Sequence, residues 1–559
     1  MKSLFARVVG FVVLVAAVIV GCRSLYGPPP SGGGGGTGTP TAPPGSDPFA
    51  SATGSFPPDS NDVPGASTPV QPQPDDAEEG EETASHFVSI QVDPVEEDTA
   101  GPKFVVAGDI DGDGLLDLAT AWNQSQPVQI HLQRRDESGA IRFESVTIAG
   151  TLPVAIMAGL ELADFDGDGG LDIAVLVKET GFTCTSNGEP IDDPSCILGE
   201  IVVYFHNEAE GSVNDGAAWQ QVEITSSNLN GEIEPDRVFD EVKTEPEWAA
   251  YTAMDAGDVD GDGDADFVVA FNPFPFEDSG GRVDIYRNPG GSSASSGDVW
   301  PAPETVLQTP SFVKDVEFLD VDEDGNLDVI STFPNLVSPN VIWTRNTGGG
   351  TFTEFPIRPI GHLDRPPGDN VFGADVVTTG DMDGDGHVDV LVRSADRRVV
   401  QWFRHPDRDS LIEPLDPSCA PICPRQNYPW QVYTLVEDEV RDPQGIAVGD
   451  LTADGQVEAV VAIGGALQWF NSATAVNGIF SPWGSEFLLD DTKEQGTTAD
   501  PTDPDFIDAA TFINDVIIAD LDGDGFGDIV ATFDRRVISG LADDRLFWFR
   551  NTLGEQNAQ

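Results

Sequence analysis

The chain of 559 residues carries 96 Asp and Glu against 28 Lys and Arg, which gives a formal net charge of -68. Proteins that bind nucleic acid through its phosphates need clustered positive charge, so this class of function is excluded. Hydrophobic residues still make up 39% of the chain and include 31 Phe and 10 Trp, which is enough apolar surface for a large folded core.

Residues 1–21 have the pattern of an export signal. Lys2 and Arg7 accompany an apolar run from Val8 to Val20, which is too short to span a hydrocarbon layer of roughly 30 Å as a mature helix. The run ends at Ile19-Val20-Gly21-Cys22, which resembles a bacterial lipobox. This resemblance implies cleavage before Cys22 and acylation of that residue, whereas the alternative is an ordinary signal with a chance Cys. We expect a lipid anchor in the bacterial envelope, at the outer membrane or cell surface.

Residues 22–85 are expected to form a disordered linker behind the anchor. They are rich in Gly, Pro, Ser and Thr and finish in an acidic patch from Asp75 to Glu82. Such a segment buries too little apolar area to offset the entropy of ordering it. About 60 residues of this composition span on the order of 40 Å, so the folded part can stand clear of the lipid surface.

The remaining cysteines are predicted to form two disulfides, Cys184 with Cys196 and Cys419 with Cys423. An exported protein meets an oxidising environment, and assigning Cys22 to lipid leaves an even number of thiols. A redox or metal pair is the alternative for Cys419 and Cys423. Because that pair lies in a Pro-rich stretch without a nearby His, a staple between loop residues is the favoured interpretation.

One acidic pattern, Asp-x-Asp-x-Asp-Gly-x-x-Asp, recurs seven times after the linker. Copies one to five and copy seven are complete. Copy six, at 450–458, is degraded and has Thr452 at position three. The acidic residues at positions one, three, five and nine are Asp109, Asp111, Asp113 and Asp117; Asp164, Asp166, Asp168 and Asp172; Asp258, Asp260, Asp262 and Asp266; Asp320, Asp322, Asp324 and Asp328; Asp381, Asp383, Asp385 and Asp389; Asp450, Asp454 and Glu458; Asp520, Asp522, Asp524 and Asp528.

Short apolar runs typical of buried strands flank each copy, as at 104–107 before the first and 267–269 after the third. An EF-hand would need flanking helices and a Glu at position twelve. That position instead holds Thr120, Val175, Val269, Ser331, Val392, Val461 and Ala531, which excludes EF-hands. Two more strands recur in each unit, so four strands in each of seven units predict an all-β, seven-bladed β-propeller.

The last unit lacks a fourth strand, because its third ends at 550–551, close to the end of the sequence. Residues 86–92 resemble the fourth strands of the other units and precede the first acidic loop. We predict that they complete the last blade and close the ring, which would remove exposed strand edges. The propeller is therefore expected to cover 86–553 and to be followed by a tail at 554–559.

These units resemble the FG-GAP or VCBS repeat family, which includes the propeller of integrin α-chains. The resemblance covers about residues 86 to 553, and it implies that each acidic loop joins the first two strands of a blade, with all loops on one face. It also implies calcium binding by the side chains at positions one, three, five and nine and by the main-chain carbonyl of position seven. The residues at position seven are Leu115, Gly170, Asp264, Asn326, His387, Gln456 and Phe526.

The composition of the loops is consistent with this implication. Four carboxylates within nine residues repel one another unless solvent or a cation lies among them. Oxygen ligands without His or Cys favour Ca²⁺ or Mg²⁺, and an irregular loop rich in ligands favours Ca²⁺. We expect six calcium sites and a seventh, in the sixth copy, that is weak or empty; the alternative is solvated acidic turns. The side chain of His387 is expected to be exposed and not a ligand.

A repeat scaffold does not by itself define a function. Our leading hypothesis is a monomeric cell-surface adhesion or binding module for an extracellular protein or glycan, with candidate contact loops at 180–199, 226–247, 361–370 and 407–429. The alternative is an exported carbohydrate-active enzyme such as a polysaccharide lyase or dehydratase. The sequence has no His-Glu-x-x-His or Gly-x-Ser-x-Gly motif and only six scattered His, so no catalytic residue is assigned, although carboxylate pairs stay open.

Overall fold

The computed structural model describes residues 87–92, 102–122, 128–148, 155–180, 184–186, 189–191, 197–206, 212–224, 248–274, 281–296, 300–309, 312–334, 340–357, 374–394, 398–406, 430–437, 443–463, 466–471, 475–476, 479–480, 485–489, 510–536 and 545–554. The predicted signal, Cys22 and linker lie outside these ranges, as do Cys196, Cys419, Cys423 and the candidate contact loops at 226–247, 361–370 and 407–429. Within the described ranges, no helix has the length and apolar character needed to cross a bilayer.

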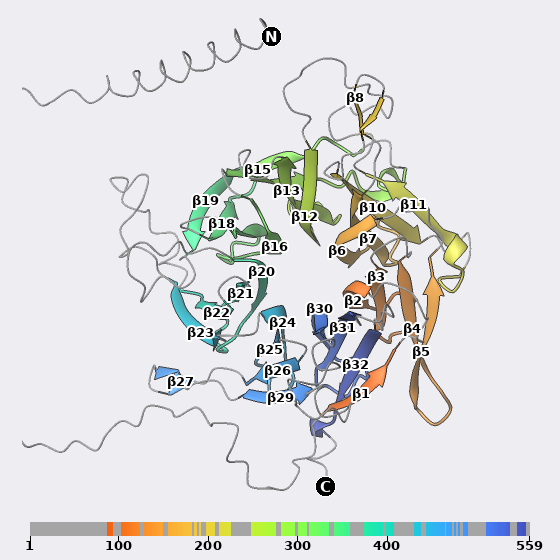
Figure 1. Cartoon of the computed structure of the whole chain (residues 1–559), viewed down its shortest axis with the longest axis vertical. Helices are drawn as coiled ribbons and strands as arrows, with labels where there is room; N and C mark the ends of the chain where they lie inside the picture. Colours follow the sequence, from red (N-terminus) through yellow and green to blue (C-terminus); the bar gives the residue numbers. More distant parts are fainter. Residues whose placement is uncertain are drawn as a thin grey trace, which may run out of the picture. The chain divides into compact units, whose positions relative to one another are not determined.

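Seven four-stranded antiparallel sheets are arranged around a common axis as the blades of a β-propeller (Figure 1). This confirms the predicted fold class. From the axis outward, the first three blades contain β2 (Pro102–Gly108), β3 (Asp117–Trp122), β4 (Gln129–Arg135) and β5 (Ile141–Thr147); β6 (Ala155–Ala163), β7 (Asp172–Thr180), β10 (Ile197–His206) and β11 (Trp219–Glu223); β12 (Trp248–Gly257), β13 (Asp266–Phe274), β14 (Gly281–Tyr286) and β15 (Glu304–Thr309).

The remaining four blades repeat this order. They contain β16 (Asp315–Leu319), β17 (Asp328–Thr332), β18 (Val341–Asn346) and β19 (Phe352–Ile357); β20 (Val376–Gly380), β21 (Asp389–Ser394), β22 (Val399–Arg404) and β23 (Gln431–Glu437); β24 (Pro443–Gly449), β25 (Glu458–Ile463), β26 (Ala466–Phe470) and β29 (Ser485–Leu489); β30 (Ala510–Ala519), β31 (Asp528–Arg536), β32 (Arg545–Asn551) and β1 (Phe87–Gln91).

Two short hairpins were not predicted from the sequence. They pair β8 (Cys184–Ser186) with β9 (Glu189–Ile191), and β27 (Ala475–Val476) with β28 (Ile479–Phe480). Both lie in long connections between strands of one blade, and the first falls within the candidate contact loop at 180–199. Two 3₁₀ turns, η1 (Gly216–Ala218) and η2 (Gly291–Ser293), complete the regular elements apart from a short helical turn at 553–554.

The hydrophobic core lies between the blades. Innermost strands of consecutive blades contact one another in the order β2, β6, β12, β16, β20, β24, β30 and back to β2. The second strands β3 and β25 are buried along their whole length, because each blade packs a neighbour against both of its faces. A tilted ring contact between Phe165 and Phe267, with centroids 4.7 Å apart, is one of the contacts that join blades 2 and 3.

The ring is closed by the N-terminal strand of the described chain. β1 pairs with β32 in antiparallel register, from Phe87 opposite Asn551 to Gln91 opposite Phe547. Phe87 is buried in a cluster with Phe549, whereas Val88 points outward and is 50% exposed. This is the closure expected from counting strands, and it joins two segments from opposite ends of the chain in one sheet.

We predict that Phe87→Ala lowers the free energy of unfolding by about 3 kcal/mol, because it leaves a cavity beside the last blade. Val88→Ala is the matched control in the same strand, and we expect it to change stability by less than about 0.5 kcal/mol. Urea unfolding of both variants measures the difference, and equal losses would contradict a closing role for β1.

Candidate metal centres

Each acidic motif forms the loop between the innermost and second strands of its blade, as the family resemblance implied. We number these loops 1 to 7 with their blades, so that loop 1 joins β2 to β3 and loop 7 joins β30 to β31. The Gly at position six has a positive φ in every loop, between 86° in Gly455 and 96° in Gly263. Side chains other than Gly rarely adopt this conformation, which explains the Gly in all seven copies.

Three carboxylates converge in each of loops 1 to 5. One ligand oxygen from each residue lies within 4.8 Å of the others. The groups are Asp109, Asp111 and Asp117; Asp164, Asp166 and Asp172; Asp258, Asp260 and Asp262; Asp320, Asp322 and Asp328; Asp381, Asp383 and Asp385. The structure thus brings three of the four predicted acids together in each of these loops: positions one, three and nine in loops 1, 2 and 4, and positions one, three and five in loops 3 and 5.

The carboxylate at position one holds the loop backbone in a curve. Asp109 Oδ2 accepts a hydrogen bond from the backbone N–H of Gly114 at 3.0 Å, and Asp164 Oδ2 accepts one from Gly169 at 2.9 Å. The same bond, from position six to position one, is present in the other five loops. In loop 1 the second oxygen, Asp109 Oδ1, is buried and has no hydrogen-bond partner. In the other six loops the second oxygen accepts a hydrogen bond from the backbone N–H of position five.

The carboxylate at position nine is buried and accepts hydrogen bonds at both of its oxygens. In loop 7, Asp528 Oδ2 accepts from the N–H of Leu521 at 3.1 Å, while Oδ1 accepts from the N–H of Asn551 at 2.7 Å. Asp117, Asp172, Asp266, Asp328 and Asp389 make the same pair of bonds to position two of their loop and to the end of the third strand. This side chain therefore ties the loop to the third strand of its own blade.

Burial makes these inner carboxylates costly to ionise. It raises the pKa of Asp172 to about 8, with the charges of Asp166 and Asp168 adding to the effect. For the same reason the pKa of Asp117 rises to about 6 and that of Asp528 to about 7. A divalent cation would offset this cost, because it stabilises the ionised forms. Buried oxygens without a partner, such as Asp109 Oδ1 and Asp166 Oδ1, supply free lone pairs, so the residues present fit a hard cation.

Residues at the end of the third strand link neighbouring loops, which the sequence analysis did not foresee. Asn551, whose N–H bonds to Asp528, also donates from Nδ2 to the carbonyl of Leu451 in loop 6 at 2.8 Å. Asn288, Asn346 and His405 make the equivalent contact with position two of the preceding loop. The recurring Asn near the end of the third strand was the available signal in the sequence. These contacts couple loops 2, 3, 4 and 6 to the next blade.

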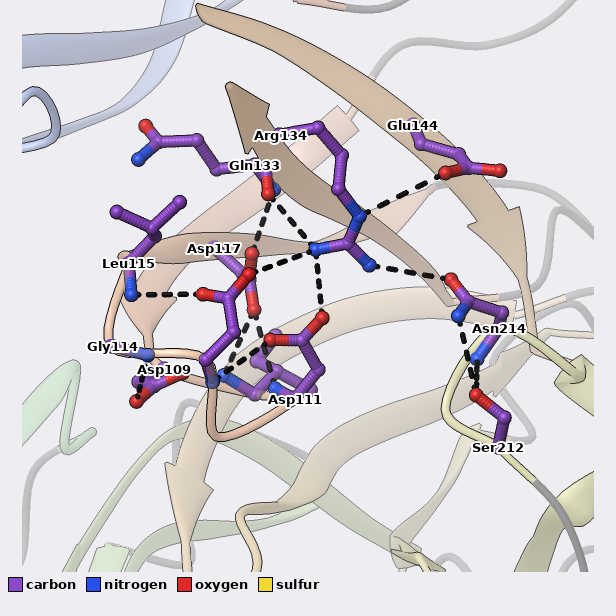
Figure 2. Close-up of polar contacts among 12 residues, drawn as sticks. Asp109, Asp111, Gly114, Leu115, Asp117, Gln133, Arg134, Glu144, Ser212 and Asn214 are labelled. Atoms are coloured by element: carbon purple, nitrogen blue, oxygen red, sulfur yellow. Dashed lines mark hydrogen bonds and ion pairs between the residues drawn. The ribbon is translucent and has the colours of Figure 1, made fainter. Parts of the chain in front are cut away.

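An arginine from the third strand pairs with the acids of five loops. Arg134, on β4, lies beside the acids of loop 1 (Figure 2). Its Nη1 is 2.7 Å from Asp111 Oδ2 and 3.4 Å from Asp113 Oδ2. Arg287, Arg345, Arg404 and Arg550 form corresponding ion pairs in loops 3, 4, 5 and 7. In loop 2 no Lys or Arg pairs with the four Asp among the described residues. Loop 2 is thus the complete loop with the least compensated negative charge in this part of the chain.

Loop 6 differs from the others in its chemistry. Thr452 replaces the carboxylate at position three, and its Oγ1 is buried without a hydrogen-bond partner. The longer Glu458 still occupies the buried position nine, where Oε2 accepts from the N–H of Leu451 at 2.8 Å. The loop therefore keeps its shape with fewer carboxylates, and the prediction of a weak or empty site stands untested.

The environment of His387 was not anticipated. Its Nδ1 lies 2.5 Å from Glu323 Oε1 in loop 4, and its ring stacks on that of His405 with centroids 5.1 Å apart. The side chain is partly buried, not freely exposed, because Glu323 and His405 flank it. His387 connects loops 4 and 5, which adds to the coupling between neighbouring loops.

The fold and the loops define the class of protein: a seven-bladed β-propeller built from repeats with an acidic loop. The chain contains FG-GAP-like repeats in three places, at residues 109–175, 258–331 and 320–392, and each match begins at position one of a loop. No protein of curated function matches the sequence.

Solved structures to which the chain is similar include the crystal structure of BBS1N in complex with ARL6DN, soaked with lead. That structure is 12% identical, with a TM-score of 0.41, and the match covers 84% of this chain and 98% of that one. The same complex soaked with mercury matches at 11% identity and a TM-score of 0.40, again covering 84% of this chain and 98% of that one.

We predict that Asn551→Ala destabilises the protein by about 2 kcal/mol, because two buried carbonyls, of Leu451 and Gly527, lose their donor. Asn471→Ala is the matched control, since Asn471 follows the third strand of blade 6 and is exposed. We expect its effect to stay below about 0.5 kcal/mol in urea unfolding without calcium. Equal effects would contradict a coupling role for the third-strand Asn.

Proposed function

We propose that this protein is a calcium-stabilised propeller that binds an extracellular protein or glycan and is held at the bacterial envelope by lipid on Cys22. The observation that supports calcium best is the set of buried carboxylate oxygens that converge in the loops without hydrogen-bond partners. Side chains at positions one, three, five and nine, with the carbonyl of position seven, would hold the ion. Bound calcium would supply the positive charge that these groups need in order to stay ionised.

Calcium in this role stabilises structure and need not transmit a signal. An ion that binds only the folded state raises stability in proportion to the logarithm of its concentration, and extracellular calcium is abundant enough to fill weak sites. Loops 2, 3, 4 and 6 are hydrogen-bonded to a residue at the end of the third strand of the next blade, as Leu451 is to Asn551. An ion that orders one of these loops would therefore stabilise its contact with the next blade, and ions in several loops would together stabilise the closed ring.

We predict that the full chain binds six calcium ions in equilibrium dialysis and melts at a higher temperature with calcium than with a chelator. Asp166→Asn, in loop 2, should remove one ion, because this loop has four Asp and no arginine pair among the described residues. Asp454→Asn, in loop 6, is the matched control and should leave the ion count unchanged. A chain that retains no calcium at saturating concentration would refute the calcium role.

The binding role is supported by architecture. Propellers present the loops between blades and between strands as a contact surface, and FG-GAP-like repeats form this one. A net charge of -68 favours neutral or basic partners over acidic polymers. We place the protein at the cell surface because the sequence of the N-terminus resembles a lipobox, and we do not assign an enzymatic activity.

Two assays test this role. The Cys22→Ser variant should lose membrane attachment, and the released chain should bind specific ligands on glycan and protein arrays in calcium. The same preparation incubated with polysaccharides should yield no product. Release of unsaturated or shortened sugars would instead identify an enzyme, and membrane attachment that survives Cys22→Ser would exclude the lipid anchor.

A further inference from the structure

The carboxylate at position three of the acidic loops has the same kind of partner in five blades, an arginine of the third strand. In blades 3, 4, 5 and 7 this arginine directly precedes the residue whose N–H bonds to the acid at position nine. The pairs are Arg134 with Asp111, Arg287 with Asp260, Arg345 with Asp322, Arg404 with Asp383, and Arg550 with Asp522. One partner position in five loops indicates a common role for these arginines.

The guanidinium uses oxygens that a bound ion would also use. In loop 4, Arg345 Nη2 lies 2.5 Å from Asp322 Oδ2 and 3.1 Å from Asp324 Oδ2, so it bridges positions three and five. Arg134 and Arg404 bridge the same two positions in loops 1 and 5. An oxygen that accepts from a guanidinium has fewer lone pairs left for a cation, and two positive charges this close repel each other. The arginine therefore competes with an ion in its loop.

The pairs differ in how far they are shielded from water. The side chain of Asp322 is 1% exposed beneath Arg345, whereas that of Asp260 beside Arg287 is 34% exposed. Water screens the attraction in the exposed pair more than in the buried one. We therefore expect the arginine of loop 4 to compete with an ion more strongly than that of loop 3.

Loop 2 keeps the acid at position three without the arginine. Phe205, which is buried in the core, precedes His206, whose N–H bonds to Asp172. Among the described residues no Lys or Arg pairs with the four Asp of this loop, and Asp166 Oδ1 is buried without a hydrogen-bond partner. Blade 6 also has Phe at this place, Phe470, but its loop lacks the acid at position three. Of the complete loops in the described chain, only loop 2 thus has its full set of acids and no competing arginine.

The neighbouring loop adds negative charge beside loop 2. The carboxylate of Asp264, at position seven of loop 3, lies against the backbone of loop 2, since a Cβ added to Gly167 would be 3.8 Å from its Oδ1. Asn288 Nδ2 holds the two loops together by donating to the carbonyl of Phe165 at 2.7 Å and to that of Ala265 at 3.0 Å. The charge of loop 3 therefore increases the attraction of loop 2 for a cation.

We propose that the third-strand arginines set the ion affinity of the acidic loops, so that loop 2 is a single tight calcium site and the arginine-paired loops are weaker. This inference rests on the proposed calcium role and adds an order of filling to it. The affinity of a site of oxygen ligands for calcium depends on the net charge of the site. Loop 2 has four Asp alone, whereas each other complete loop has four Asp and a guanidinium. Loop 2 would stay filled at calcium concentrations that leave the others empty.

Calcium titration of the full chain by isothermal calorimetry tests this order. We expect one tight site and a class of weaker sites whose Kd is higher by about tenfold or more. Asp166→Asn, at position three of loop 2, should remove the tight site and leave the weaker class. Asp260→Asn, at position three of loop 3, is the matched control and should remove one weaker site only. Sites of one uniform affinity would overturn the order while leaving the calcium role intact, and a chain that binds no calcium would overturn both.

Arginine variants test the cause of the order. Arg345→Gln should tighten one of the weaker sites by about tenfold, because the positive charge that competes with the ion is gone. It should also widen the gap in Tm between calcium and chelator, since only the ion-free loop depends on the arginine for compensation of its charge. A purely structural arginine would lower Tm equally in both conditions.

Arg282→Gln is the matched control for this measurement. Arg282 also lies on a third strand, but it pairs with Asp284, outside the loops, at 2.6 Å. Its loss should lower Tm equally with calcium and with chelator and leave every Kd unchanged. If Arg345→Gln does not fold, Arg287→Gln in loop 3 replaces it with the same direction of change. An unchanged calcium affinity in the arginine variant would overturn the proposal.

Discussion

The structure depends on one recurring interaction, the buried carboxylate at position nine of each acidic loop. In six blades an Asp there accepts a backbone N–H from its own loop at one oxygen and another from the third strand at the other, as Asp528 does with Leu521 and Asn551. In blade 6, Glu458 keeps the bond to the loop. A single buried carboxylate thus fixes the corner of the blade, and burial raises its pKa, an effect that nearby positive charge would offset.

This constraint accounts for much of what surrounds it. The residue at position two must be apolar, because its N–H points at the buried acid while its side chain enters the core, as with Ile110 and Phe165. The residue that bonds to the acid from the third strand also reaches the preceding loop in four blades, as Asn551 reaches Leu451. Acidic loops and the contacts between adjacent blades are therefore joined by hydrogen bonds. Compensating the charge of a loop would consequently also stabilise the ring.

The negative charge of the chain is distributed between two distinct places. Loop acids are partly compensated by arginines such as Arg134 and Arg345, which leave other carboxylate oxygens to face one another. Innermost acids such as Asp255 and Asp515 instead accept N–H groups from the next blade. The first arrangement suits ions held near the surface of one face, and the second joins blades around the axis. In both places burial makes a carboxylate unfavourable unless ion pairs or hydrogen bonds compensate its charge.

Local pattern in the sequence was sufficient for the blades, the acidic loops and the closing strand at 86–92, because strand alternation and turn glycines act over a few residues. It was not sufficient for the ion pairs of the arginines or for the hydrogen bonds of the asparagines that link loops to the next blade. Those depend on which blades become neighbours: Asp515 bonds to Val105, 410 positions away. Such residues come together only when the ring closes. The sequence of one repeat does not determine which side chains of other repeats lie beside it.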